Sequence, residues 1–156
     1  MIQINRIPCG NVNCFIVVKG DNAILVDTGK EKYQEKILSV CNKYPIRLIV
    51  LTHGHIDHVQ NTAYLKQLTE YLDDDCILTD VGSVKANIHE EVQTLGIGKY
   101  FIGGHPMVGS EKAGFSFSSD RLVENAYYFI TPTKKVSEQR VKDFTNFIEE
   151  LGALTI

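Results

Sequence analysis

The densest group of reactive side chains is the hexapeptide HGHIDH at residues 53–58. It follows residues 47–51, an aliphatic run typical of a strand buried on both faces in a parallel sheet, and α/β sheets place their sites at such strand ends. Three imidazoles and a carboxylate suit Zn²⁺, which binds nitrogen and oxygen ligands, so the segment predicts one or two zinc ions. The predicted ligands are His53 and His55 for one ion, and Asp57 and His58 for a second. The alternative is a polar helix-capping loop with incidental histidines.

A second set of polar residues lies in three blocks of the C-terminal half. The blocks are TDVGSVK at residues 79–85, GGHPMVGSEKAG at residues 103–114 and ENAYYFITPT at residues 124–133. The first block is expected to end a parallel strand and turn into a helix, which presents Ser83 and backbone amides at the sheet edge. Ser83 could also serve as the N-cap of that helix, and His105 could be a loop histidine without a role.

Hydrophobic periodicity predicts an α/β chain with a mostly parallel sheet, flanking helices and an N-terminal β meander. Strands are expected at residues 3–7, 14–18, 23–26, 47–52, 76–81, 100–102, 126–131 and 153–156. Helices are expected at residues 31–44, 64–72 and 84–95, and a last one between an N-cap at Ser137 and a C-terminal cap at Gly152, with an inner face of Val141, Phe144, Ile148 and Leu151. Residues 103–125 carry glycine and proline without a sustained period and are predicted to be a loop.

Composition narrows the function classes. The chain has 156 residues, 44% of them hydrophobic, and a net charge of −3 from interspersed acidic and basic side chains. This balance predicts one soluble domain and no nucleic-acid partner. No apolar run reaches the ~20 residues that cross a bilayer, and the N-terminus has no signal-like pattern, so we expect no membrane partner and a cytoplasmic location. The four irregularly spaced cysteines are expected to be reduced and mostly buried. The oligomeric state is left open.

The N-terminal segment resembles the metallo-β-lactamase-fold hydrolases over residues 2–59. HGHIDH matches their H-x-H-x-D-H signature, and Asp27 of the upstream VDTG matches a carboxylate that supports the metal ligands in that family. The resemblance implies a metal-bound hydroxide that attacks an ester, thioester or lactam, with Asp57 helping to orient it. The family also needs a third histidine, a bridging aspartate and a final histidine, for which only His89 and His105 remain.

The three C-terminal blocks resemble the nucleotide-binding domain of prephenate and arogenate dehydrogenases, NAD(P)-dependent oxidoreductases of tyrosine biosynthesis. The resemblance covers residues 64–156 in block order and spacing. It implies the oxidative decarboxylation of a small-molecule substrate, in which His105 accepts the proton of the substrate's ring hydroxyl and Ser83 holds the hydroxyl or the imidazole. It also implies an acidic residue near the substrate entrance, which is Glu111. The cofactor, NAD or NADP, would be bound by Asp80, Gly82 and Ser83.

The chain departs from this family in its first half. No G-x-G-x-x-G follows a first strand; the nearest match, at residues 96–101, lacks the third glycine and follows a helix. A helix N-terminus for the pyrophosphate is therefore not predicted, and the residue that chooses NAD or NADP would lie in the missing part. The helical dimerisation domain is also missing, so we expect an incomplete dehydrogenase.

These resemblances predict a chimera-like chain with a metallo-β-lactamase-like segment at residues 1–63 and a dehydrogenase-like segment at residues 64–156, packed as one domain. The junction is expected within residues 59–71. The favoured function is prephenate or arogenate dehydrogenase-like; the alternatives are a zinc-dependent hydrolase and an inactive recombinant domain. A further alternative is one hydrolase across the whole chain. Its two ions would be held by His53, His55 and His105, and by Asp57, His58 and Asp120.

Overall fold

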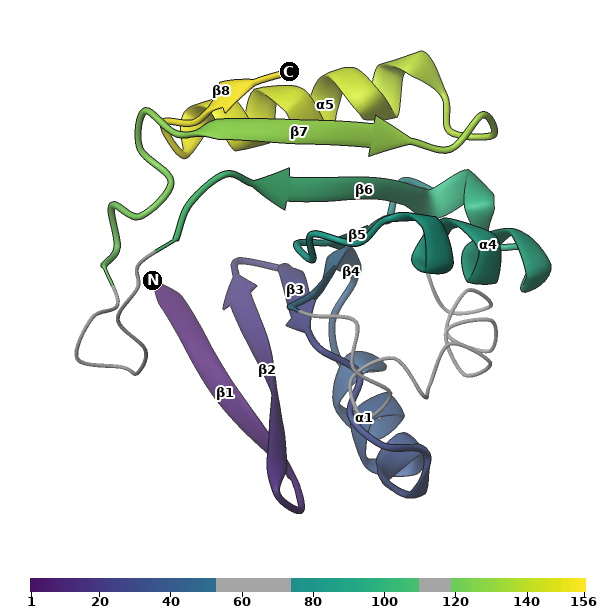
Figure 1. Cartoon of the computed structure of the whole chain (residues 1–156). Coiled ribbons are helices and arrows are strands. Elements are labelled where there is room, and N and C mark those ends of the chain that lie inside the picture. Colours follow the sequence, from purple (N-terminus) through teal and green to yellow (C-terminus); the bar gives the residue numbers. More distant parts are fainter. Residues whose placement is uncertain (53–73, 110–118) are drawn as a thin grey trace.

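The alternating burial of the first three strands builds the predicted meander. In the computed structural model, which describes residues 1–52, 74–109 and 119–156, β1 (Ile2–Cys9), β2 (Val12–Lys19) and β3 (Asn22–Val26) pair antiparallel in succession. The turns between them carry Gly10 and Gly20 at positive φ, which glycine adopts without steric cost. The N-terminal meander is thereby confirmed (Figure 1).

The remaining strands extend the same sheet. β4 (Ile46–Leu51), β5 (Ile77–Asp80) and β6 (Phe101–Pro106) follow β3 in parallel, β7 (Tyr127–Pro132) is antiparallel to β6, and β8 (Leu154–Thr155) is parallel to β7. The described residues thus form one mixed eight-stranded sheet whose spatial order is its chain order. The α/β class is confirmed, and four of the seven neighbouring pairs are parallel, as a mostly parallel sheet requires.

Helices cover both faces of this sheet. The core on one face joins Ile37 of α1 (Gln34–Cys41) and Ile88 of α4 (Ala86–Thr94) to the sheet, and the core on the other face includes Phe144 and Ile148 of α5 (Glu138–Glu150). Figure 1 shows α5 running along β7 and β8, while α1 and α4 lie toward the middle strands. No described helix is long and apolar enough to cross a membrane.

Two expectations need correction. The predicted helix at residues 31–44 divides into a 3-10 turn, η1 (Glu31–Tyr33), and α1. The predicted loop at residues 103–125 is wrong at its start, because Gly103 and Gly104 belong to β6. Glycine lowers strand propensity, but both glycines lie where cross-strand neighbours leave no room for a side chain.

The last helix and the cysteines follow their predictions more closely. The Ser137 hydroxyl accepts from the backbone N–H of Arg140 at 3.4 Å, and Gly152 ends the helix at a φ of 87°. Of the predicted inner face, Leu151 is exposed. All four cysteines are buried free thiols, as predicted.

Candidate active site

Four strands that run in the same direction end at one edge of the sheet. The polar residues at these ends are Asp27 after β3, Thr52 after β4, Asp80 at the end of β5 and His105 near the end of β6. Backbone hydrogen bonds tie neighbouring ends together, from the Asp27 N–H to the Val50 carbonyl at 2.9 Å and from the Val81 N–H to the Leu51 carbonyl at 3.0 Å. Open α/β sheets bind their ligands at this edge.

Asp27 fixes the residue that precedes the histidine-rich segment. Its carboxylate accepts from the Thr52 N–H and from the Thr52 hydroxyl, each at 2.8 Å. Asp27 is buried and has a positive φ of 59°, a conformation that aspartate tolerates better than most residues. The ends of β3 and β4 are therefore held in register directly before His53.

The predicted zinc ligands His53, His55, Asp57 and His58 lie outside the described residues. Within residues 1–52, 74–109 and 119–156, no group of three or more histidine, cysteine or acidic side chains is placed to hold a metal ion. His105 and Asp120, the described members of the single-hydrolase alternative, thus belong to no such group in the described part of the chain.

Asp80 organises the turn that follows β5. Its fully buried carboxylate accepts at Oδ2 from the Gly82 N–H at 3.1 Å and from Lys85 Nζ at 2.6 Å. Lys85 Nζ also donates to the Gly82 carbonyl. These bonds close the turn over Asp80 and leave Ser83 exposed at its tip.

Ser83 is not the cap of the helix, which corrects one expectation. The helix predicted at residues 84–95 starts at Ala86, its N-cap is Lys85, and no side chain caps it. The Asp80 clamp accounts for the shift, since Lys85 reaches back to Asp80 and Gly82 before the helix begins. Ser83 therefore does not cap this helix.

His105 lies in β6 rather than in a loop, opposite Phe129 of β7. Its Nδ1 is buried and has no hydrogen-bond partner among the described residues. The structure brings Asp80, Gly82, Ser83 and His105 to the carboxyl ends of the adjacent strands β5 and β6. Glu111 lies outside the described residues.

Tyr128 is a buried neighbour of the site that periodicity alone did not single out. A Cβ at Gly104 would fall on the Tyr128 hydroxyl and lie 2.9 Å from the Asp80 carbonyl oxygen. Burial, and then the negative charge of Asp80, raises the pKa of Tyr128 to about 12. The signal in the sequence is the Gly103-Gly104 pair before His105, because paired glycines in a strand indicate close approach of neighbouring groups.

The glycines of residues 96–101 lie at the other end of β6. Gly96 has a φ of 73° in the turn after α4, and Gly98 begins η2 (Gly98–Tyr100), which leads into β6. This segment is therefore at the amino end of the strand, away from the edge that carries Asp80 and His105, and does not serve as a dinucleotide-binding loop.

Two protein families match the sequence. The model of the prephenate dehydrogenase nucleotide-binding domain matches residues 48–156, and that of the metallo-beta-lactamase superfamily matches residues 7–72. The two matches overlap across β4 and the residues after it.

Relatives and solved structures agree with the first match. The chain is 35% identical over 83 residues to a prephenate dehydrogenase of Bacillus subtilis, covering 53% of this chain and 22% of that protein. It is 41% identical over 81 residues to the Lactococcus lactis enzyme, covering 50% and 23%. The crystal structure of Aquifex aeolicus prephenate dehydrogenase in complex with hydroxyphenyl propionate and NAD⁺ has 30% identity and a TM-score of 0.61, covering 76% of this chain and 40% of that one. The chain thus spans less than a quarter of these two curated relatives.

Proposed function

The chain belongs to the family of prephenate dehydrogenase nucleotide-binding domains, and on that premise we propose that the carboxyl ends of β5 and β6 bind the nicotinamide side of NAD. The observation that carries the proposal is the clamp of Asp80 on Gly82 and Lys85, which holds an exposed turn with Ser83 at its tip. A turn that is already fixed in the free protein loses little conformational entropy when a flat ring binds against it.

The described residues fit the nicotinamide half of NAD but not its pyrophosphate half. On the nicotinamide side, Gly82 and Ser83 offer backbone and hydroxyl groups in the turn after β5, and β5 pairs with β6, the strand that carries His105. On the pyrophosphate side, the parallel neighbour of β4 is β3, which is followed by the carboxylate of Asp27 rather than by a glycine-rich turn. The helical turn after it begins with the acidic Glu31, which opposes an anion at a helix N-terminus.

Three side chains receive roles in this proposal. Bound NAD would supply the hydride acceptor for oxidation at the ring carbon that carries the substrate's hydroxyl. His105, as a neutral imidazole, accepts the proton of that hydroxyl, which favours the loss of CO₂. Ser83 donates to or accepts from the hydroxyl or the imidazole and keeps them aligned. Glu111, which lies outside the described residues, is proposed by its resemblance to the family's acidic residue near the substrate entrance. The substrate class is prephenate or arogenate.

The test separates the two halves of the cofactor. We expect nicotinamide mononucleotide and NAD⁺ to shift the amide NMR signals of Gly82 and Ser83 at millimolar concentration, and ADP-ribose to leave them unchanged. Ser83→Ala should weaken binding several-fold, whereas Ser39→Ala, at an exposed serine of α1, should not. Absence of shifts with millimolar nicotinamide mononucleotide would refute the proposal.

A second candidate function is metal binding by the histidine-rich segment. It is supported by the match over residues 7–72 and by the carboxylate of Asp27, which is held against Thr52 directly before the segment. The proposed ligands are His53 and His55, joined by Asp57 and His58 for a second zinc ion, and the bound metal would supply a Lewis acid for hydrolysis. The protein should then retain one or two equivalents of zinc and lose it on His55→Ala; a folded protein without zinc at excess metal would contradict this.

We also propose that residues 1–63 and 64–156 form one domain, with the junction at residues 59–71. The support is a shared core, in which Ile16 of β2 and Phe101 of β6 belong to one cluster, and the parallel pairing of β4 with β5. Separation of the segments would expose both strands of that pair.

A further inference from the structure

A cavity of about 440 Å³ lies between α5 and the face of the sheet on which this helix packs. α5 forms one wall with Phe144 and Phe147, and β2 to β5 form the floor. The floor residues of β3, β4 and β5 are the first residues of these strands, so the cavity lies at the edge opposite to the candidate active site. Small-molecule sites are typically cavities of roughly 300–1,000 Å³ with mostly apolar linings.

The floor contains one row of aliphatic side chains that crosses four strands. Val17 of β2 pairs with Ile24 of β3. Leu48 of β4 pairs with Ile24 on one side and with Ile77 of β5 on the other. Because neighbouring strands are about 4.8 Å apart, the row is about 14 Å long. Val17, Ile24 and Ile77 are only half-buried, so this apolar row can still contact an extended aliphatic chain.

Positively charged side chains flank the row toward the edge strand. Lys19 and Asn22 pair with each other, two residues along β2 and β3 from the aliphatic row and therefore on the same face. The ladder between β3 and β4 skips Arg47 at a register shift after Ala23, and such irregularities redirect side chains. Arg47 lines the cavity as a result, and its Nε donates to Asn22 Oδ1 at 3.0 Å.

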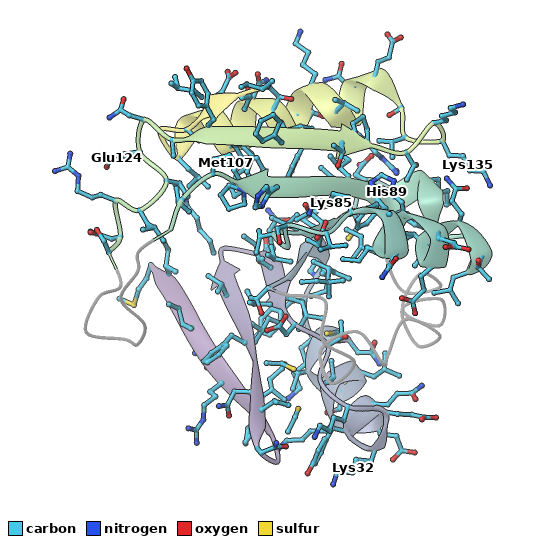
Figure 2. The ribbon with its side chains drawn as sticks, in the orientation of Figure 1. Lys32, Lys85, His89, Met107, Glu124 and Lys135 are labelled. Carbon is cyan, nitrogen blue, oxygen red and sulfur yellow. The ribbon has the colours of Figure 1, made fainter. Side chains whose placement is uncertain are left out.

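A negative charge marks the other end of the row. Asp143 of α5 lines the cavity and, together with Ile77, also lines a neighbouring polar cavity. Figure 2 shows Lys135, another residue of that second cavity, in the turn before α5. The Asp143 carboxylate accepts from Gln139 Nε2 at 2.8 Å. The first cavity therefore attracts an anionic group toward β2 and repels one toward β5.

We propose that this cavity binds a free aliphatic monocarboxylate of medium chain length, with its chain along the aliphatic row and its carboxylate at Lys19 and Arg47. The volume is that of a small-molecule site, and the cations favour an acid over a neutral hydrocarbon. Asp143 disfavours a second carboxylate at the far end. Ser83 and His105 lie at the opposite edge of the sheet, so the inference is independent of the proposed function.

The test uses the full chain and a series of hexanoate, octanoate and decanoate below their micelle concentrations. We expect saturable NMR shifts at Val17, Ile24 and Leu48, with an affinity that rises about two- to fourfold for each added methylene. Lys19→Gln should weaken octanoate binding about threefold and leave the binding of neutral 1-octanol unchanged. The control is Lys32→Gln, which should affect neither ligand; Figure 2 shows Lys32 beside α1, away from α5.

Phe147→Ala removes part of the α5 wall and should weaken both octanoate and 1-octanol. If this variant does not fold, Lys19→Gln retains the test, because Lys19 is exposed. Three results would overturn the proposal: no shifts with millimolar octanoate, shifts of these residues only with anionic phosphatidylglycerol vesicles, or self-association of the ligand-free chain that buries the same residues. Failure of nicotinamide mononucleotide to bind would count against the proposed function alone.

Discussion

The ammonium of Lys85 lies 2.6 Å from the carboxylate of Asp80, and this ion pair closes the turn that carries Ser83. The Asp80 side chain is fully buried and that of Lys85 is 18% exposed, so water screens the pair weakly. The same carboxylate accepts from the Gly82 N–H, and its charge adds to the effect of burial, which is the larger cause of the raised pKa of Tyr128. The buried carboxylate of Asp80 thus interacts both with the turn after β5 and with Tyr128 of β7.

Replacing Lys85 by methionine should destabilise the protein strongly. The substitution leaves the Asp80 charge buried without its cation, which costs about 3 kcal/mol of unfolding free energy. Urea unfolding measures this loss, and Asp80→Asn in the same chain should restore part of it. The matched control is Arg121→Met, which breaks an exposed 2.8 Å pair with Glu124 and should have no measurable effect. If Lys85→Met and Arg121→Met lowered the free energy of unfolding equally, the buried Asp80–Lys85 pair would stabilise the protein no more than the exposed pair does.

Adding a methyl group at Gly104 should also destabilise the protein, by about 1–3 kcal/mol, because the Cβ meets the Tyr128 hydroxyl and the Asp80 carbonyl. Tyr128→Phe removes the hydroxyl and should relieve part of the cost in the double variant. The control is Gly109→Ala, where no atom of the described residues lies within 4 Å of the added Cβ. Thermal unfolding of the unmodified protein and of the four variants measures these losses, and a Gly104→Ala protein as stable as the unmodified one would contradict this close packing.

Tyr128 should resist ionisation. Burial and the Asp80 charge raise its pKa to about 12, so the folded protein keeps this phenolic proton at a pH where the unfolded chain, with a tyrosine pKa of about 10, has lost it. Its contribution to stability is therefore fully present below pH ~10 and is lost as the pH rises through about 12. Ultraviolet titration of the folded protein should show a late-ionising tyrosine that is absent in Tyr128→Phe; an unchanged titration curve in that variant would disprove the assignment.

The bond pair between Asp27 and Thr52 should make Asp27 sensitive to substitution. Asp27→Asn keeps one oxygen acceptor and tolerates positive φ, so we expect a loss of about 1–2 kcal/mol. Asp27→Ala removes both acceptors and adds backbone strain at a φ of 59°, so its loss should be larger. Chemical denaturation gives the comparison, with Asp21→Ala in the exposed β2–β3 turn as the control. The reverse order of Asp27→Asn and Asp27→Ala would contradict the geometry.

Local sequence patterns predicted most helices and strands, because each of these segments has its own hydrophobic periodicity or capping residues. The alternation in β1 and β2 places Ile7 and Ile16 in the core, and the N-cap at Ser137 and the terminal glycine at Gly152 bracket α5. The extension of β6 through Gly103 and Gly104 could not be read this way, because glycine favours a strand only where neighbouring groups exclude a side chain, and those neighbours come from β5 and β7.

Site residues that lie close together in the sequence were predicted from their motif. Contacts between residues that only the folded chain brings together were missed. The TDVGSVK block indicated Asp80 and Ser83, but it did not reveal that Lys85 reaches back to Asp80 and delays the helix to Ala86. Nor did the sequence connect His89 with Gly103, since their contact depends on how α4 packs on β6.

The most direct test of the central claim, that the two segments share one sheet whose parallel strands end at a common site, is hydrogen exchange resolved by peptide across a denaturant series. A single cooperative domain predicts that amides of β4 and of β7 exchange with the same opening free energy and the same denaturant dependence. Rapid exchange in β1 to β4 beside protected β6 and β7, or the reverse, would contradict it, because one segment would then fold without the other.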